Sequence, residues 1–145
     1  MEVEIRLEPE LPDIKVVIRA PARTEEVEAL AARLSGIPEP LWGFRGEEAV
    51  PLQTDGVLRF YGEDKAVRAQ TAQAIYTVRP RLYELEQLLP PGQFVRISHS
   101  EIVNLQQVTG LDLSLTGTIR MTLSGGTACY VSRRYVKKIK EALGL

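Results

Sequence analysis

The stretch "GQFVRISHSEIVNLQQV", residues 92–108, decides the fold because polar residues interrupt a strand pattern in its middle. A strand-like run at 94–97 gives way to Ser98, His99 and Ser100, and the apolar signal resumes at 102–105. The single histidine of the chain stands between two serines. Three interpretations are open: a hydrolase site, a structural turn, or a loop that contacts a partner.

The hydrolase interpretation fails on geometry. A catalytic triad needs a serine, a histidine base and an orienting carboxylate within reach of one another. Neighbours in an extended segment point to opposite faces, so His99 is directed away from both serines. The chain has no Gly-x-Ser-x-Gly elbow and no phosphate-binding glycine loop, and its one histidine and one cysteine, 30 positions apart, make no zinc ligand set. We therefore expect no enzyme activity, no cofactor and no metal.

Composition limits the class of protein. The 145 residues suffice for one domain, or for a domain of about 100 residues with a small extension. Apolar residues make up 44% of the chain, yet no run approaches the ~18 that span a membrane, so we expect no membrane insertion. The opening "MEVEIRLEPE" lacks the regions of a secretory signal, and Cys129 has no partner for an internal disulfide. These features favour a cytoplasmic protein.

The net charge of −1 hides an uneven distribution. Residues 1–48 carry 11 acidic and 6 basic side chains, whereas residues 49–145 carry 8 acidic and 12 basic ones. A basic segment beside an acidic one is typical of proteins that bind nucleic acid through one part, although a solvated surface produces the same pattern.

The first third of the chain predicts a small ββα-like unit. Residues 2–7 alternate charged and apolar side chains, and "IKVVI" at 14–18 is a second strand candidate. Thr24 is a good N-cap for a helix with glutamates in its first turn, which Gly36 ends. Three prolines and two glycines in residues 37–52 indicate a linker, so we place a domain boundary near residue 46.

The remainder, residues 47–145, reads as mainly β with short helices, an α+β class. Strand patterns occur at 57–61, 66–70 and 74–78, and a leucine-rich helix follows at about 82–89. After the opening stretch, residues 111–131 alternate as a three-stranded meander with one buried face. A helix from about Arg133 closes the chain.

This last helix carries an unusual charge pattern. Ser132 is a suitable N-cap, but Arg133 and Arg134 follow it in the first turn, where cations oppose the helix dipole at a cost of ~0.3–1 kcal/mol each. Together with Lys137 and Lys138 they favour an anion partner such as phosphate over a merely solvated face. Other basic residues, each also interpretable as an ordinary surface cation, stand at Lys65, Arg68 and Arg96.

Three segments together resemble the LytTR family of DNA-binding domains: "RLYELEQLLP" at 81–90, "FVRISHSEIVNL" at 94–105 and "YVSRRYVKKIKEAL" at 130–143. The resemblance covers roughly residues 50–145, and its core, Arg-x-x-x-Ser-x-x-Val-Asn, is specific. It implies an elongated assembly of small antiparallel sheets joined by short helices. It also implies that loops, rather than a recognition helix, enter the grooves of DNA.

The resemblance also implies which residues contact DNA. Lys65 falls in a loop that members place in a major groove, and Arg134 matches an arginine that reads bases. Ser98 stands where the family commonly has histidine, and His99 takes the next contact position. The remaining candidate DNA-binding residues are Arg68, Arg96, Ser100, Asn104, Ser132, Arg133, Lys137 and Lys138, with Asn104 alternatively pinning a turn through its amide.

The sequence therefore predicts a bacterial, cytoplasmic transcription regulator that binds repeated promoter elements in double-stranded DNA as a homodimer. The alternative is a protein-interaction module whose basic surface meets an acidic partner. We assign residues 1–46 to dimerisation or to a protein partner. That length is too short for a phosphoreceiver domain of ~120 residues, so we expect the short stand-alone type of the family.

Overall fold

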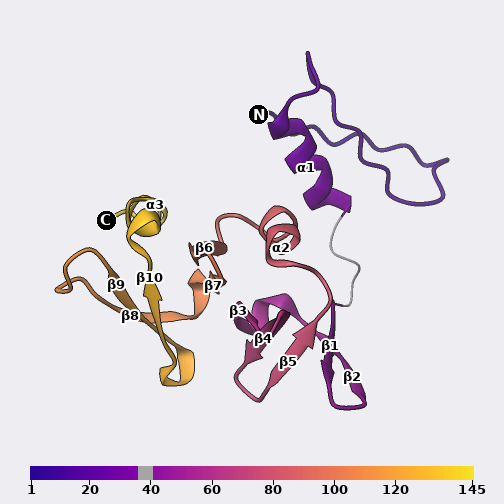
Figure 1. Ribbon diagram of the computed structural model, residues 1–145. Coiled ribbons are helices and arrows are strands. Elements are labelled where there is room, and N and C mark those ends of the chain that lie inside the picture. The colour runs from indigo at the N-terminus through magenta and orange to yellow at the C-terminus, as the bar shows by residue number, and fades with distance from the viewer. Residues whose placement is uncertain (36–40) are drawn as a thin grey trace.

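The computed structural model describes residues 1–35 and 41–145, and these residues form two antiparallel sheets and three α-helices (Figure 1). The larger sheet has the order β2-β1-β5-β4-β3-β7-β6 and the smaller has the order β10-β9-β8. The strands of the larger sheet are β1 (Leu41–Arg45), β2 (Glu48–Leu52), β3 (Val57–Glu63), β4 (Ala66–Thr71), β5 (Ile75–Val78), β6 (Phe94–Ser98) and β7 (Glu101–Asn104). The other elements are β8 (Val108–Asp112), β9 (Ile119–Leu123), β10 (Ala128–Val131), α1 (Glu25–Ser35), α2 (Leu82–Leu88) and α3 (Val136–Leu143).

The stretch that interrupts the strand pattern forms the β6–β7 hairpin. Val95 pairs with Val103 and Ser98 with Glu101, with an irregularity between Arg96 and Ser98. Side chains alternate between the faces of a strand, and here both faces are covered. Phe94 therefore packs into one core while Val95 packs into the other, which explains why this strand reads as a nearly continuous apolar run.

Two hydrophobic cores lie on opposite faces of the larger sheet. The first fills the space beneath α2, with Phe60, Leu85 and Ile102 fully buried. The second joins the larger sheet to the smaller one and to α3, where Ile97, Met121 and Ile139 are fully buried. The second core thus fixes α3 relative to the β6–β7 hairpin.

Most predicted elements of the main part are confirmed. The strands at 57–61, 66–70 and 74–78 correspond to β3, β4 and β5, and the leucine-rich helix is α2. The three-stranded meander is also present as β8, β9 and β10. Its first strand ends at Asp112 rather than near residue 115, and Leu113 is 52% exposed. The expected mainly β fold with short helices is therefore observed.

The expected start of the last helix was wrong by three residues. Residues Arg133–Tyr135 form a single 3-10 turn and α3 begins at Val136. The Ser132 side chain makes no capping hydrogen bond. Its backbone N–H instead donates to Ile97 O at 2.8 Å, which ties the turn to β6.

The two strands expected at 2–7 and 14–18 are not formed, so the predicted ββα-like unit contains only its helix, α1. Thr24 caps this helix as predicted, because its hydroxyl accepts from Val27 N at 3.3 Å. The expected stop at Gly36 lies outside the described residues. A strand needs a partner for its backbone groups, and within the described residues of this chain neither segment finds one.

The expectation of a linker at 37–52 was wrong for residues 41–52, which form the β1–β2 hairpin of the larger sheet. Phe44 of β1 also pairs with Thr77 of β5. The sheet therefore begins at Leu41, a few residues before the boundary placed near residue 46. None of the helices in residues 1–35 and 41–145 is both long and apolar enough to cross a membrane.

Candidate functional site

The turn between β6 and β7 presents His99 and Ser100 to solvent. Both side chains are exposed, whereas Ile97 just before them is fully buried. Ser98 shapes the turn, because its hydroxyl accepts a hydrogen bond from Ser100 N at 3.3 Å. The chain thus passes within two residues from the core to the tip of a loop.

Arg96 braces this turn from within. Its Nε donates to Ser98 O at 3.0 Å, a second guanidinium nitrogen donates to His99 O, and a third donates to Glu86 of α2 at 2.7 Å. The side chain is only 12% exposed. All three nitrogens of the guanidinium group are thus occupied within the molecule, which gives Arg96 a positioning role and leaves it little surface for an external partner.

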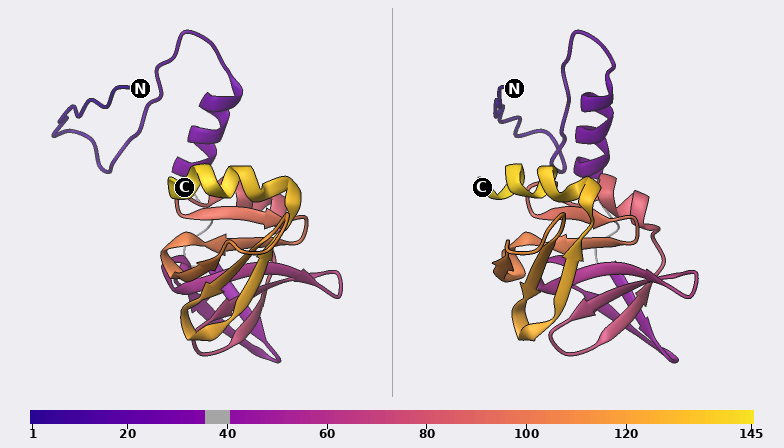
Figure 2. Two further views of the ribbon diagram at one scale, coloured as in Figure 1. Left: turned by 90° about the vertical axis from the view of Figure 1, so that its left-hand side faces the viewer. Right: turned by 60° about the vertical axis from the view of Figure 1, so that its left-hand side comes forward.

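Two backbone hydrogen bonds place other loops beside the β6–β7 turn. Gly62 N at the end of β3 donates to Ser100 O at 2.9 Å, and Ser132 N donates to Ile97 O at 2.8 Å. The β3–β4 hairpin therefore lies on one side of the turn and the start of α3 on the other. Both views of Figure 2 show the hairpin and the first turn of α3 directed toward the same side of the body.

The β3–β4 hairpin carries Lys65 at its tip. Asp64 and Lys65 both have positive φ, 51° and 64°, as a two-residue hairpin turn of the mirror-image type requires. The Lys65 side chain is exposed, while its carbonyl accepts a hydrogen bond from Arg81 at 3.1 Å. The tip is thus fixed at its backbone and free at its ammonium group.

The 3-10 turn before α3 holds Arg133 and Arg134, both exposed. The Arg134 guanidinium lies 5.9 Å from the centre of the Tyr135 ring. Arg133 packs against Gly117, which has a φ of +75° and where an added Cβ would lie 3.0 Å from an Arg133 nitrogen. Of the two arginines, Arg134 therefore has the more open guanidinium group.

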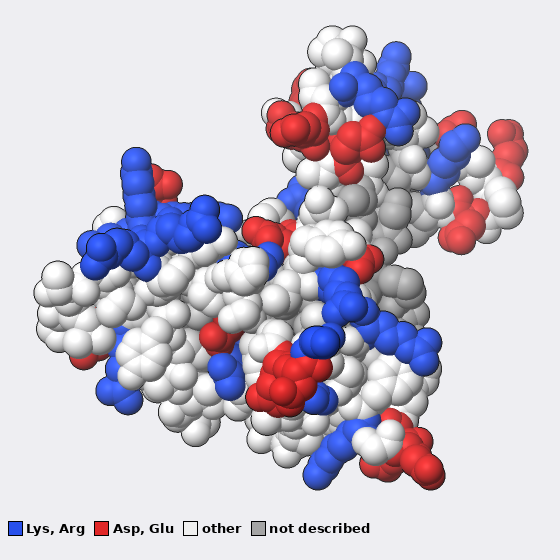
Figure 3. Space-filling model, viewed as in Figure 1, with Lys and Arg blue, Asp and Glu red and all other residues white. Residues whose placement is uncertain are grey.

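Basic side chains gather over α3 on the face shown in Figure 3, with few acidic ones among them. Lys137, Lys138 and Lys140 are exposed on the helix and follow the two arginines of the preceding turn. We call these five residues the α3 cations. The surface over α3 is therefore mainly basic in Figure 3, and Glu141 is the one acidic residue of this helix.

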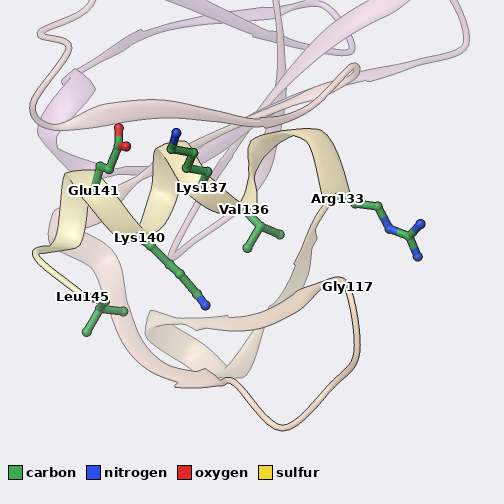
Figure 4. Close-up of a pocket in the computed structure, with 7 residues that line it drawn as sticks. All are labelled: Gly117, Arg133, Val136, Lys137, Lys140, Glu141 and Leu145. Carbon is green, nitrogen blue, oxygen red and sulfur yellow. The ribbon is translucent and has the colours of Figure 1, made fainter.

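A shallow groove of about 480 Å³ runs between α3 and the loop that holds Gly117. In Figure 4, Val136 and Lys140 point into this groove, whereas Lys137 and Glu141 point away from it. Its lining mixes an apolar floor with the cations Arg133 and Lys140. The groove therefore extends the positive surface of α3 toward the Gly117 loop.

The prediction that Asn104 contacts DNA has to be corrected, because its side chain is fully buried. Its amide donates to Asp55 O at 3.1 Å and to Val57 O at 2.9 Å, and its carbonyl oxygen accepts from Gln106 N at 3.1 Å. Every polar atom of this side chain thus has a partner. The alternative role, in which the amide pins a turn, fits the structure.

Arg68 is also held by the sheet rather than presented at its edge. It donates to the Thr77 hydroxyl, and its Nε lies 3.8 Å from Glu63. Ser132 is half-buried, and its hydroxyl oxygen has no hydrogen-bond partner among the described residues. The structure therefore brings together the exposed tips at Lys65, His99, Ser100, Arg133 and Arg134, and leaves Arg68, Arg96 and Asn104 as supports.

Sequence reasoning missed a polar cluster under the turn. Arg59 of β3 donates to Glu101 at 2.8 Å and to Gln70 at 2.7 Å. The Arg59–Glu101 pair is mostly buried, so it fixes the first residue of β7 after the turn. These residues are 42 positions apart in sequence, and only the strand pairing of β3 with β7 brings them together.

Cys129 lies beside this cluster, fully enclosed in the second core. Burial raises the pKa of the Cys129 thiol to about 12, and the Glu101 carboxylate acts in the same direction. The thiol is therefore protonated near neutral pH and makes a poor nucleophile. It belongs to the packing of β10 and not to the exposed site.

Comparison with known proteins identifies relatives of both parts of the chain. Residues 47–144 match the family model described as the LytTr DNA-binding domain. An uncharacterised HTH-type transcriptional regulator of Staphylococcus aureus strain NCTC 8325 is 36% identical over 130 residues, covering 88% of each chain. A protein of the same description from strain MRSA252 is 35% identical over the same length.

The match to these relatives extends beyond the family model. Residues 47–144 are only about two thirds of this chain, so coverage of 88% includes residues before 47. Among solved structures, the LytTr DNA-binding domain of a Bacillus cereus methyl-accepting/DNA response regulator superimposes with a TM-score of 0.70. It is 23% identical and covers 72% of this chain and 96% of its own, which shows a shared fold.

Proposed function

We propose that this chain, which belongs to the LytTR family of DNA-binding domains, is a bacterial transcription regulator that binds repeated promoter elements as a homodimer. Family membership rests on the match over residues 47–144 and on the Staphylococcus relatives. The observation that supports DNA binding by loops is a pair of backbone hydrogen bonds, one from Gly62 and one from Ser132. These bonds set three exposed loops side by side. An array of loops with basic tips suits a duplex whose phosphates and base edges lie along a groove.

Loops, rather than a helix, are the reading elements in this proposal. In a helix-turn-helix, two consecutive helices place the second one in the major groove. Here the helices of the described residues are separated by strands, with β1 to β5 between α1 and α2 and β6 to β10 between α2 and α3. One face of α3 is committed to the second core through Ile139. That leaves the preceding turn and the lysines of α3 for DNA.

Base edges are assigned to the exposed tips of the three loops, namely Lys65, His99 and Arg134. Lysine and arginine both bond the major-groove acceptors of guanine, and arginine does so with two parallel hydrogen bonds. Arg134 is the strongest candidate because its guanidinium is exposed and packs only loosely against Tyr135. Ser100 stands next to His99 at the same tip and is assigned to the same groove.

Phosphate contacts are assigned to Arg133, Lys137 and Lys138, which are exposed at the 3-10 turn and at the start of α3. Such contacts position a protein on the duplex without reading sequence. Three neutralised phosphates give a log–log salt slope near −3 for each bound copy, at about −0.9 per phosphate.

Substitution of Arg96 tests whether this side chain positions the β6–β7 turn for DNA binding. Arg96→Ala removes the brace on Ser98 O and His99 O, so we expect affinity for the DNA element to fall about 10-fold, equivalent to ~1.4 kcal/mol. The salt slope should stay unchanged, because the phosphate contacts remain. Titrations at several salt concentrations check this, with Arg45→Ala as a control at an exposed arginine of β1. A slope that falls by about 1 for Arg96→Ala would show a direct phosphate contact instead.

The remaining parts of the proposal concern assembly and place of action. Two copies of one element favour two copies of the protein, and we assign dimerisation, or contact with a protein partner, to the acidic residues before the sheet. Since β1 belongs to the larger sheet, the DNA-binding part is taken to start at Leu41. A regulator of bacterial promoters works in the cytoplasm, where we place this chain.

The experiment that tests the function is selection of bound genomic fragments, followed by footprinting at several salt concentrations. We expect protection at two spaced copies of one element and a clear salt dependence. Binding that is sensitive to salt but shows no preferred sequence would contradict the proposal. It would favour the protein-interaction alternative, in which the α3 cations meet an acidic partner.

A further inference from the structure

The first residues of the chain carry apolar side chains that nothing in this molecule covers. Val3, Ile5 and Ile14 are 81%, 83% and 90% exposed, and Val16 and Leu7 are also exposed. They belong to two segments, 2–7 and 12–17, that alternate as strands do but have no strand partner within the described residues (Figure 1). Several large apolar side chains exposed in two neighbouring segments indicate an interaction site.

The two segments are complementary to each other in one antiparallel register. When Val3 is set opposite Val16 and Ile5 opposite Ile14, the spacing also sets Glu4 opposite Lys15 and Arg6 opposite Asp13. The central apolar pairs then fall on one face and the opposite charges on the other, which is how cross-strand pairs stabilise a sheet. At the ends of this register Leu7 stands opposite Pro12, and Glu2 stands opposite Val17. A shift by one residue would mix the two faces.

We infer that segments 2–7 and 12–17 form the interface with a second copy of this chain, in which each segment pairs with its complement from the partner. This inference rests on the proposed homodimer and names its contact surface. Such an exchange is isologous, so each contact occurs twice. It yields two ribbons whose apolar faces can cover each other, whereas a lone two-stranded ribbon is marginal in water.

The partner is a second copy because each segment finds its complement in the other segment of the same sequence, while within one chain the two segments form no strand pair. Segment 2–7 has two acidic residues and one basic residue. Lys15, whose charge is opposite to that of Glu4, lies eleven positions further along the same chain. In the structure Arg6 instead pairs with Glu4 of its own segment at 2.9 Å, with both side chains largely exposed.

Charge reversal of the full chain tests pairing between copies. Glu4→Lys alone and Lys15→Glu alone place like charges opposite each other and should shift the mass found by sedimentation from dimer toward monomer. Mixing the two variants should restore a dimer, because each chain then supplies the charge that the other lacks. Glu10→Lys, in the turn between the segments, makes the same change of charge and should leave the dimer intact.

Replacement of an apolar residue of the interface supplies a second readout. Ile5→Lys should weaken the dimer at least about 100-fold, since the loss occurs twice and each buried side chain is worth about tenfold. Binding to a single DNA element should be unchanged, which separates failure of this interface from failure of the DNA-binding proposal. The inference would be overturned if the wild type were a monomer or if Ile5→Lys remained a dimer. It would also be overturned if the dimer returned only when both charge changes were made in one chain and not when the two single variants were mixed.

Discussion

Asn104→Ala is expected to lower the free energy of unfolding by about 3 kcal/mol. The change removes both amide hydrogen bonds to the carbonyls of Asp55 and Val57 and the bond from Gln106 N. Val57 lies in the first core, so its carbonyl would lose its partner away from water, and an unsatisfied buried group costs about 1–3 kcal/mol. Denaturant unfolding measures the loss, and the melting temperature should fall by roughly 10 °C.

Gln107→Ala is the matched control for this prediction. Gln107 also donates to Asp55 O, at 3.3 Å, but this bond lies at the surface. Its loss should change stability by no more than about 0.5 kcal/mol. If Asn104→Ala proved as stable as Gln107→Ala, the buried amide would not be what joins the end of β7 to the start of β3.

The β6–β7 stretch shows how far sequence reasoning reaches for this chain. The alternation on either side of Ser98 to Ser100 predicted two strands with a polar tip, and the structure has that hairpin. The prediction works because the pattern of apolar and polar residues close together in sequence determines both the strand register and the buried face. The same holds for α2, where leucines three and four apart face the first core.

The supports of the site could not be predicted in this way. Arg96 resembles any surface cation in sequence, and only the turn geometry directs it back to Ser98 O and His99 O. Likewise, Arg59 and Glu101 meet through strand pairing between distant parts of the chain. Long-range pairs of this kind leave no local pattern for the sequence to reveal.

The segments at 2–7 and 14–18 show the opposite case. Residues 2–7 alternate as regularly as the strands in the sheets and residues 14–18 are a branched run, yet both segments remain unpaired in the single chain. A strand pattern indicates which face of the strand is apolar and suited to burial. It does not indicate whether the pairing strand comes from the same chain or from another molecule. The contrast between pattern and exposure is therefore itself informative about assembly.

Arg134→Ala is the second change with a large expected effect. The side chain is exposed at the 3-10 turn that Ser132 ties to β6, next to the β6–β7 turn. Loss of a bidentate contact to a base should cost about 1–3 kcal/mol on the preferred element and relax the preference at one base pair. Stability should hardly change, because Arg134 is exposed and the described residues show it in no ion pair and no side-chain hydrogen bond.

Lys138→Ala is the control, since it removes one positive charge from the same surface. Lys138 is exposed on α3 and is assigned to a phosphate. We expect weaker binding to all sequences by about the same factor and a salt slope reduced by about 1.

The most direct test titrates wild type, Arg134→Ala and Lys138→Ala against the selected element and a full set of its single-base variants at one salt concentration. Loop-borne reading of DNA predicts that Arg134→Ala binds all four bases equally at one position while Lys138→Ala keeps the wild-type order of preference. Equal losses on every sequence for both variants would contradict it.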